Sequence, residues 1–251
     1  MPEGIVLTRT PLREYDEVIS FITRDFGRVD VLAKSVKKIT SKLSPHLESF
    51  SHVSFDSVQG KEMAILTTVT AIEFFPHIRT HYIKSLQAEF ASHALHRLTR
   101  PGNLEHGVFD LFSEWLQMFD SVADVSDCRF LDWFMLKLME AIGFEPTYLA
   151  CLRCGRTDNL SFWSFSGGGV VCSSCSAKNT ESETLFRITP QTIHDLARLS
   201  SGSLQELGEG TPFAPGVHSL LVGHLQYQAE AKIGNWAHTC LQEEVASGKL
   251  A

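Results

Sequence analysis

Hydrophobic and polar residues alternate along most of the first 75 residues. Residues 4–10 predict a short opening strand. Residues 16–35 predict two strands joined at Asp25-Phe26-Gly27-Arg28, because that turn contains the glycine that a tight hairpin needs. Residues 47–75 predict another pair around Gln59-Gly60-Lys61. About five short strands with short connections are typical of a small closed β-barrel.

After Pro76 the hydrophobic period changes from two residues to the spacing of a helix. Apolar residues recur at this spacing along residues 83–98, 108–119 and 130–142, and Pro101-Gly102-Asn103 separates the first two segments. Ser126 is the expected N-cap of the third helix and Gly143 its expected C-cap. Strands followed by helices, in separate blocks, indicate an all-β domain joined to a helical one.

The last third of the chain holds a cysteine-rich segment followed by more helices. Thr189-Pro190 predicts a helix start, with threonine as the cap and proline in the first turn. A Gly/Pro-rich loop and one or two C-terminal helices come next. The predicted fold class is multi-domain α+β: a five-stranded closed barrel over residues 1–78, a helical domain over 79–147 and 187–251, and a four-cysteine zinc-binding insertion over 148–186.

Composition limits the class of protein. The chain has 251 residues, a formal charge of −7 and 43% hydrophobic residues, which is enough to form a core. It contains no long apolar run of the kind that crosses a membrane, and the N-terminus does not resemble a signal peptide. We therefore expect a reducing, intracellular location. In that compartment clustered cysteines favour metal binding or redox chemistry over structural disulfides.

Four of the six cysteines form two Cys-x-x-Cys pairs, Cys151 with Cys154 and Cys172 with Cys175. Each pair can aim two sulfurs at one point, and a hairpin between the pairs would close a tetrahedron of thiolates around a metal. The intervening residues favour such a hairpin, because alternating residues lead to Gly167-Gly168-Gly169. The spacing predicts one structural Zn²⁺ ion, with no open position for catalysis.

Other interpretations of these cysteines remain open. Four buried thiols without metal and a redox Cys-x-x-Cys pair are less favoured, since a redox site would leave the second pair idle. An iron–sulfur cluster is the alternative metal group. Cys128 and Cys240 stand alone, and we predict that they are buried thiols.

The most basic stretch runs from residue 24 to residue 42. It falls on and after the second and third predicted strands, a face on which small barrels bind single-stranded nucleic acid. Phe26 in the turn is a candidate for stacking on a base, although packing on the barrel rim is the simpler interpretation. A solvated surface remains the alternative for the basic residues themselves, which are Arg24, Arg28, Lys34, Lys37, Lys38 and Lys42.

Motifs for enzymatic chemistry are missing from the sequence. The triple glycine is not a phosphate loop, because no Gly-Lys-Ser/Thr follows it. There is no nucleophile elbow and no paired-carboxylate signature. His93 and His96 have helical spacing for a metal, but no third ligand lies near them in sequence. We therefore expect no enzymatic activity.

Taken together, these parts resemble the bacterial RecO family of recombination mediators. The resemblance spans nearly the full length and rests on residues 4–38, on SFSHVSF followed by FFPHIR, and on GFEPTYLACLRCG continuing to GGGVVCSSC. It implies an OB barrel, a helical domain and a zinc-binding element. Lys34, Lys37 and Lys38 match the family's basic segment, Arg9 lies where the family is also basic, and the four paired cysteines match its zinc ligands.

The resemblance also implies a function. Family members bind single- and double-stranded DNA, anneal complementary strands, and help to load the recombinase with RecR, RecF and the single-stranded DNA-binding protein. The implied location is the cytoplasm, at the nucleoid, without a membrane. This chain is more acidic than a strong DNA binder. A zinc-containing protein-interaction adaptor with little direct DNA binding is therefore the alternative function, and an accessory domain of a nuclease or ligase is a weaker rival.

Overall fold

The computed structural model describes residues 1–123, 125, 127–178, 184–209, 213–214 and 216–230. The contacts between these residues divide them into two compact units, which meet in sequence at residues 123–125. We describe each unit by itself. The domain boundaries expected from the sequence are not tested by this division and stay a prediction.

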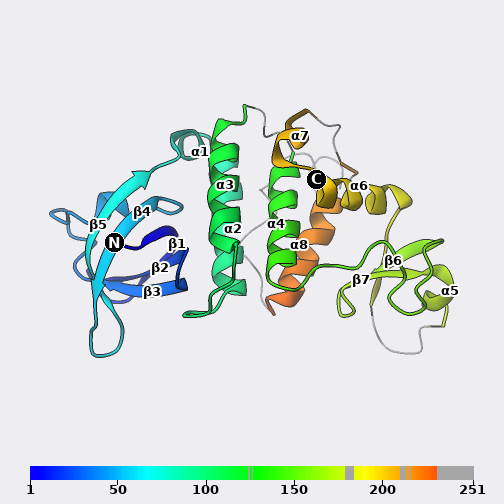
Figure 1. The fold of residues 1–251 in the computed structure, drawn as a ribbon, viewed down its shortest axis with the longest axis horizontal. Helices are drawn as coiled ribbons and strands as arrows, with labels where there is room; N and C mark the ends of the chain where they lie inside the picture. Colours follow the sequence, from blue (N-terminus) through cyan, green and yellow to red (C-terminus); the bar gives the residue numbers. More distant parts are fainter. Residues whose placement is uncertain (124, 126, 179–183, 210–212, 215, 231–251) are drawn as a thin grey trace, which may run out of the picture. The chain divides into compact units, whose positions relative to one another are not determined.

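The N-terminal unit begins with a closed five-stranded barrel, as the alternation predicts (Figure 1, blue and cyan). Its strands are β1 (Glu3–Pro11), β2 (Glu17–Thr23), β3 (Gly27–Ala33), β4 (His52–Val58) and β5 (Ile65–Glu73). The order around the barrel is β1-β2-β3-β5-β4. All pairs are antiparallel except the short parallel contact of β3 with β5, and β1 closes the barrel on β4.

Alternation places one face of each strand inside the barrel, because successive side chains of a strand point to opposite faces. Phe21 and Phe55 stack there with ring centroids 4.4 Å apart. The core also contains Val6, Ile19, Val31, Ala33, Val36, Leu47, Val53, Leu66 and Val69. The segment between β3 and β4 contributes Val36 and Leu47 to this core and includes the short 3-10 helix η1 (Ser44–His46).

Three helices complete the N-terminal unit: α1 (Pro76–Thr80), α2 (Tyr82–Leu98) and α3 (Val108–Ser121). The sequence analysis did not predict α1, in which Pro76 takes the first helical position, one that suits a proline. Both α2 and α3 pack against β1. The rings of Phe112, Trp115 and Phe119 are stacked along α3 and fully buried.

The second unit contains α4 (Arg129–Ala141), α6 (Pro190–Ser201), α7 (Leu204–Glu209) and α8 (Val217–Gln228), with α4 in contact with the other three. The predicted caps are confirmed at two ends. Thr189 caps α6 by accepting from Thr192 N, and Gly143 follows α4 with a φ of +80°. Ser126 lies outside the described residues, and α4 begins after Cys128.

The cysteine-rich segment folds as a small sheet with the order β7-β6-β8. Its strands are β6 (Leu160–Ser164), β7 (Gly169–Cys172) and β8 (Leu185–Arg187), and the short helix α5 (Ser173–Ser176) follows β7. The β6–β7 hairpin and its glycine turn are as predicted. Neither β8 nor α7 was expected, since both are too short for a clear hydrophobic period. The part of the predicted C-terminal helices beyond residue 230 lies outside the described residues.

Candidate nucleic-acid interface and metal centre

Four of the predicted DNA-binding residues lie in one segment that leaves the barrel after β3. These residues are Lys34, Lys37, Lys38 and Lys42, and all four are exposed. Within the described part of the chain none of them forms an ion pair. Their charges are therefore available to an external anion.

The loop between β1 and β2 lies beside this lysine segment. Lys37 N donates to Tyr15 O over 3.1 Å, and Ser35 N donates to the Asp16 carboxylate over 2.7 Å. Ser35 adopts a left-handed backbone conformation, φ +54°, as the chain turns out of β3. These bonds join residues 12–16 and 34–42 into one surface, which we call the loop surface.

The loop surface contains a cation that the sequence analysis did not select. Arg13 is exposed in the β1–β2 loop and has no ion pair among the described residues. Its proximity to the lysines depends on the pairing of β2 with both β1 and β3. From the sequence alone, the one indication that Arg13 belongs with the lysines was its position in the short loop before β2. The loop surface thus presents five basic side chains against one exposed acid, Glu14.

Arg24 and Arg28 lie at the other end of the β2–β3 hairpin. The register pairs Thr23 with Gly27 at the turn and Glu17 with Ala33 at the lysine end. Seven residues of strand between the two ends correspond to about 20 Å. The residues from Arg24 to Lys42 therefore do not form one continuous basic surface. At the turn, Phe26 is 57% exposed and Arg24 pairs with Asp110.

Arg28 is engaged within the protein. Its guanidinium donates to the carbonyls of His96 and Thr99, at the C-terminal end of α2. The last carbonyls of a helix lack partners inside the helix, and a cationic side chain there satisfies them. Only 12% of the side chain is exposed, and it also pairs with Asp30. Arg28 therefore caps α2 and is poorly placed to contact a phosphate.

Arg9 is also paired. Its guanidinium contacts the Glu17 carboxylate at 2.8 Å and the Glu48 carboxylate at 3.2 Å. Glu17 is buried, so an unpaired charge there would be costly and Arg9 offsets it. From β1, Arg9 links the start of β2 to the segment before β4. Its role is therefore structural.

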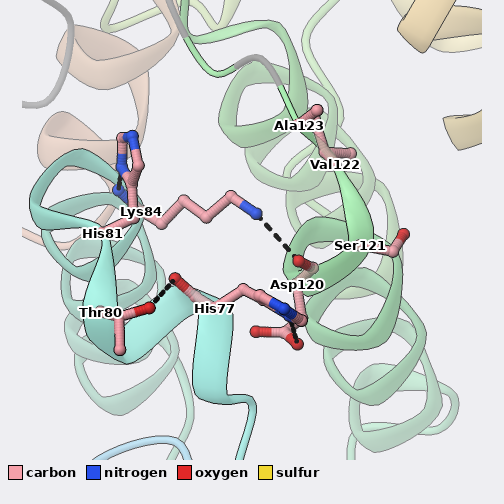
Figure 2. A pocket seen from close by; sticks show the side chains of 8 residues that line it. All are labelled: His77, Thr80, His81, Lys84, Asp120, Ser121, Val122 and Ala123. Atoms are coloured by element: carbon pink, nitrogen blue, oxygen red, sulfur yellow. Dashed lines mark hydrogen bonds and ion pairs between the residues drawn. The ribbon is translucent and has the colours of Figure 1, made fainter.

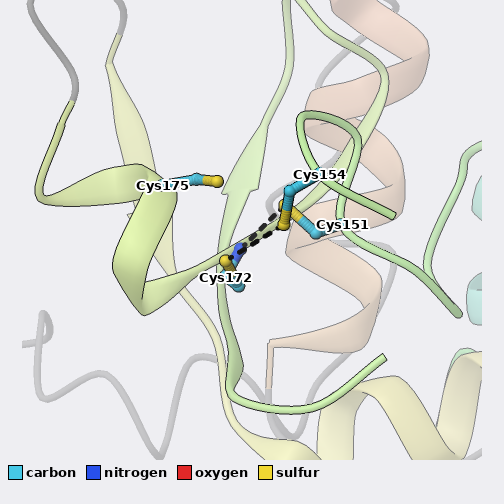
Figure 3. Close-up of side chains that lie close together, drawn as sticks. All are labelled: Cys151, Cys154, Cys172 and Cys175. Atoms are coloured by element: carbon cyan, nitrogen blue, oxygen red, sulfur yellow. Dashed lines mark hydrogen bonds between the residues drawn. The ribbon is translucent and has the colours of Figure 1, made fainter. Parts of the chain in front are cut away.

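The four predicted metal ligands converge in the second unit (Figure 3). All four sulfurs lie within 4.8 Å of one another, and Cys154 Sγ is 3.7 Å from Cys172 Sγ. Sulfurs about 2.3 Å from a tetrahedral zinc would be separated by about 3.8 Å. The cluster can therefore hold a metal ion. Cys151 and Cys172 are buried, whereas Cys154 is exposed and Cys175 half-buried.

Backbone structure explains how the pairs aim their sulfurs. In the first pair, Gly155 N donates to Cys151 O over 2.9 Å, and Gly155 has a φ of +72° that favours glycine. In the second pair, Cys172 ends β7 and Cys175 lies on α5. Arg153 joins the two halves by donating to Cys175 O over 3.1 Å.

The protonation of this cluster is uneven. Burial raises the pKa of Cys151, but backbone N–H groups that donate to its sulfur outweigh burial and lower the pKa to about 6. Hydrogen bonds to Cys154 and Cys172, together with burial, raise the pKa of Cys175 to about 12. Without a metal ion, therefore, the four thiols do not all lose their protons together. A divalent cation reverses that preference, because metal ligation requires deprotonated thiols.

The two remaining cysteines differ from the expectation or cannot be compared with it. Cys128 is buried, as predicted, but it is bonded in a disulfide, so the prediction of a free thiol is wrong for this residue. Cys240 lies outside the described residues.

A pocket of about 390 Å³ lies between α1, α2 and the end of α3 (Figure 2). Its polar side chains are already engaged in hydrogen bonds within this unit. Buried Lys84 donates from Nζ to Asp120 O, and the Asp120 carboxylate accepts from Ile78 N and contacts His77 Nδ1. Burial lowers the pKa of Lys84 against the opposing effect of Asp120. These bonds tie the helices together, which is a structural role.

Comparison with known families covers nearly the whole chain. The family described as "Recombination protein O N terminal" matches residues 2–75, and "Recombination protein O C terminal" matches residues 79–236. The chain belongs to the RecO family. The first match coincides with the barrel that carries the loop surface, and the second includes the cysteine cluster.

Curated relatives agree with this assignment. A protein of Dehalococcoides mccartyi is 28% identical over 71% of this chain and 70% of its own length. Relatives from Listeria monocytogenes and Caldanaerobacter subterraneus are 26% and 25% identical, over 78% and 99% of this chain and 75% and 96% of their own lengths. Each is named DNA repair protein RecO. No helix among the described residues is long and apolar enough to cross a membrane.

Proposed function

We propose that this chain is a DNA-binding mediator of recombination and repair. In this proposal it anneals complementary strands and helps to load a recombinase on gapped DNA coated with single-stranded DNA-binding protein. RecR, RecF and that coating protein are the proposed partners, in the cytoplasm at the nucleoid. The observation that carries the proposal is the loop surface: exposed cations, without ion pairs among the described residues, gathered at one end of an OB-type barrel.

The proposed mechanism is electrostatic. Two single strands repel each other because both are polyanions, and cations placed between them reduce that repulsion. Arg13, Lys34, Lys37, Lys38 and Lys42 can neutralise phosphates, releasing their condensed counterions. Pairing of the bases then supplies the driving force. No bond is made or broken by the protein, so annealing needs no catalytic residue and is consistent with a chain without enzymatic activity.

The proposed interface is narrower than the set expected from sequence. Arg9 and Arg28 are left out, because their guanidinium groups are paired inside the barrel unit. Arg24 is left out because it pairs with Asp110 at the far end of the hairpin. Arg13 is added. The overall charge of −7 does not oppose binding, because screening by salt limits the reach of distant acidic groups to roughly 10 Å.

We further propose that the cysteine cluster binds one Zn²⁺ as a structural ion. Four sulfur ligands and tetrahedral spacing fit zinc, and they leave no open position for a reacting group. The ion would hold the two Cys-x-x-Cys turns together and so support the surrounding segment. With four thiolates the site is net negative, which separates it from the phosphate-binding role.

The test is a strand-annealing assay with complementary oligonucleotides, with and without coating by single-stranded DNA-binding protein. The proposal expects wild-type protein to accelerate annealing, and the triple variant Lys34→Glu, Lys37→Glu, Lys38→Glu to lose that acceleration for every sequence tested, because backbone contacts carry no sequence information. Wild-type protein that neither anneals strands nor is retained on immobilised single-stranded DNA at low salt would support the adaptor alternative instead.

A further inference from the structure

Exposed apolar side chains lie among the cations of the loop surface. Leu12 is 52% exposed, Tyr15 is 43% exposed, and the side chain of Ile39 is fully accessible. Leu12 directly precedes Arg13 in the β1–β2 loop, Tyr15 follows two positions after it, and Ile39 directly follows Lys38 in the lysine segment. A purely electrostatic phosphate-binding surface has no need of such residues.

Tyr15 is held in place within this surface. Its carbonyl accepts from Lys37 N, and Lys38 Nζ lies 5.3 Å from the centre of its ring. A phenol ring and an ammonium group thus lie 5.3 Å apart on this surface. A base in a single strand is linked to a phosphate over a similarly short distance, so one nucleotide can contact the ring and the ammonium together.

We propose that Tyr15, supported by Leu12 and Ile39, stacks on unpaired bases and makes the loop surface prefer single-stranded to double-stranded DNA. The inference rests on the proposed DNA-binding function and adds a specificity-determining residue to it. In a duplex the faces of the bases are stacked inside the helix, so only the phosphates are accessible. In a single strand both faces and phosphates are accessible, and an aromatic ring between cations recognises that combination.

The charge around the apolar residues decides between possible occupants. An apolar surface for another protein needs no particular sign of charge, whereas this one is bordered by Arg13, Lys37 and Lys38. These cations outnumber the one exposed acid beside them, Glu14, which accepts a hydrogen bond from the Tyr15 hydroxyl. Phe26 does not offer the same combination. It lies at the hairpin turn, and its cationic neighbours Arg24 and Arg28 are already paired.

The experiment compares Tyr15→Ala with wild type on a labelled oligothymidylate and on a blunt duplex of matched length, at several salt concentrations. Loss of one stacked base should weaken oligothymidylate binding by about 5- to 150-fold. Duplex binding should change less than about twofold, and the salt dependence on both DNAs should stay as in wild type, because no cation is removed. Tyr15→Phe, which keeps the ring, should bind as wild type does.

A matched control and a second readout keep the test independent of folding. Tyr82→Ala removes another exposed tyrosine, 70% exposed at the start of α2, and should bind both DNAs normally. In Tyr15→Trp, the added indole fluorescence should be quenched by oligothymidylate and not by the duplex. Normal oligothymidylate binding by Tyr15→Ala, equal losses on both DNAs, or an indole that does not respond would each overturn the stacking proposal.

Failure of this inference differs from failure of the proposed function. If wild-type protein binds neither DNA, the proposed function is wrong and the loop surface has another partner. If wild-type protein binds both DNAs with the expected salt dependence and Tyr15→Ala does the same, only the stacking role is wrong. Self-association of wild type that Tyr15→Ala abolishes, without any effect on DNA binding, would assign the apolar residues to a protein contact.

Discussion

At the scale of single residues, the structure separates cations with similar sequence contexts by what each one contacts. Lys34 and Lys37 have no ion-pair partner among the described residues, whereas Arg28 satisfies carbonyls at the end of α2. Sequence can predict that a residue is charged and near a strand. It cannot show that a helix about 70 residues later ends beside that residue, because the contact depends on tertiary packing.

The Arg28 cap predicts a stability effect without a DNA effect. Arg28→Met should lower the free energy of unfolding by about 2 kcal/mol, since charge-assisted hydrogen bonds are lost and two carbonyls lose a partner. Chemical denaturation measures this loss. The salt dependence of DNA binding should not change. A reduced salt dependence in the folded variant would instead show that Arg28 contacts a DNA phosphate.

His224 predicts a dependence of stability on pH. The residue is fully buried, and burial lowers its pKa despite a contact with Phe144 O that raises it. The unfolded chain therefore binds the proton more readily than the folded one. This contribution to stability is present above the unfolded pKa of about 6.5 and decreases as the pH falls below it. Titration followed by NMR should give a pKa below 6.5 for His224; a higher value would contradict this account.

At the scale of elements, the close approach of the β2–β3 turn to the α2–α3 loop can be tested with glycine substitutions. Gly27 has a φ of +63°, and a Cβ there would collide with the backbone carbonyl of Asn103. Gly102 has a similar φ of +74° but open space around it. Both alanine variants should lose about 1 to 2 kcal/mol from backbone strain.

Gly27→Ala should lose more than Gly102→Ala because of the added collision. Thermal unfolding of the two variants side by side isolates this packing contribution. Equal losses in the two variants would mean that the turn and the loop do not pack closely.

The cysteine cluster predicts metal-dependent folding of one segment. Purified protein should contain about one zinc per chain and show no visible absorbance, which distinguishes zinc from an iron–sulfur cluster. Cys175→Ser should lose the metal, and hydrogen exchange should then rise in β6 and β7 while the barrel stays protected, because metal-binding energy is folding energy there. The matched control for Cys175→Ser is Ser176→Ala, which changes the neighbouring side chain and should keep the metal. Full zinc content in Cys175→Ser would contradict a four-sulfur site.

The elements themselves were largely predictable from the sequence. Alternation, turn glycines and helical spacing identify β1 to β5, α2 to α4, α6 and the β6–β7 hairpin, because each has a strong local pattern. Short elements such as α1 and β8 depend on packing and have no such pattern. The clustering of the four cysteines was predictable because two closely spaced pairs with a hairpin between them bring four sulfurs to one point, where they could hold a metal ion.

At the scale of the whole molecule, the candidate interface was only partly predictable. The lysines after β3 were identified correctly as exposed, but grouping them with Arg24 and Arg28 ignored the length of the hairpin between them. The sequence analysis did not select Arg13 and Tyr15, which the proposed interface adds, because their proximity to the lysines arises from the barrel's strand pairing. A chain with a net charge of −7 can therefore carry a local basic surface whose position follows from its topology.

The most direct test of the central claim is the salt dependence of DNA binding by wild type and by a variant with Arg13, Lys34, Lys37, Lys38 and Lys42 all replaced by glutamine. With about five phosphates neutralised, a plot of log K against log salt concentration should have a slope of about −4 to −5 on duplex DNA and about −3.5 on single strands. The variant's slope should approach zero, while Arg24→Gln keeps the wild-type slope. A flat wild-type plot, or an unchanged slope in the fivefold variant, would contradict the account.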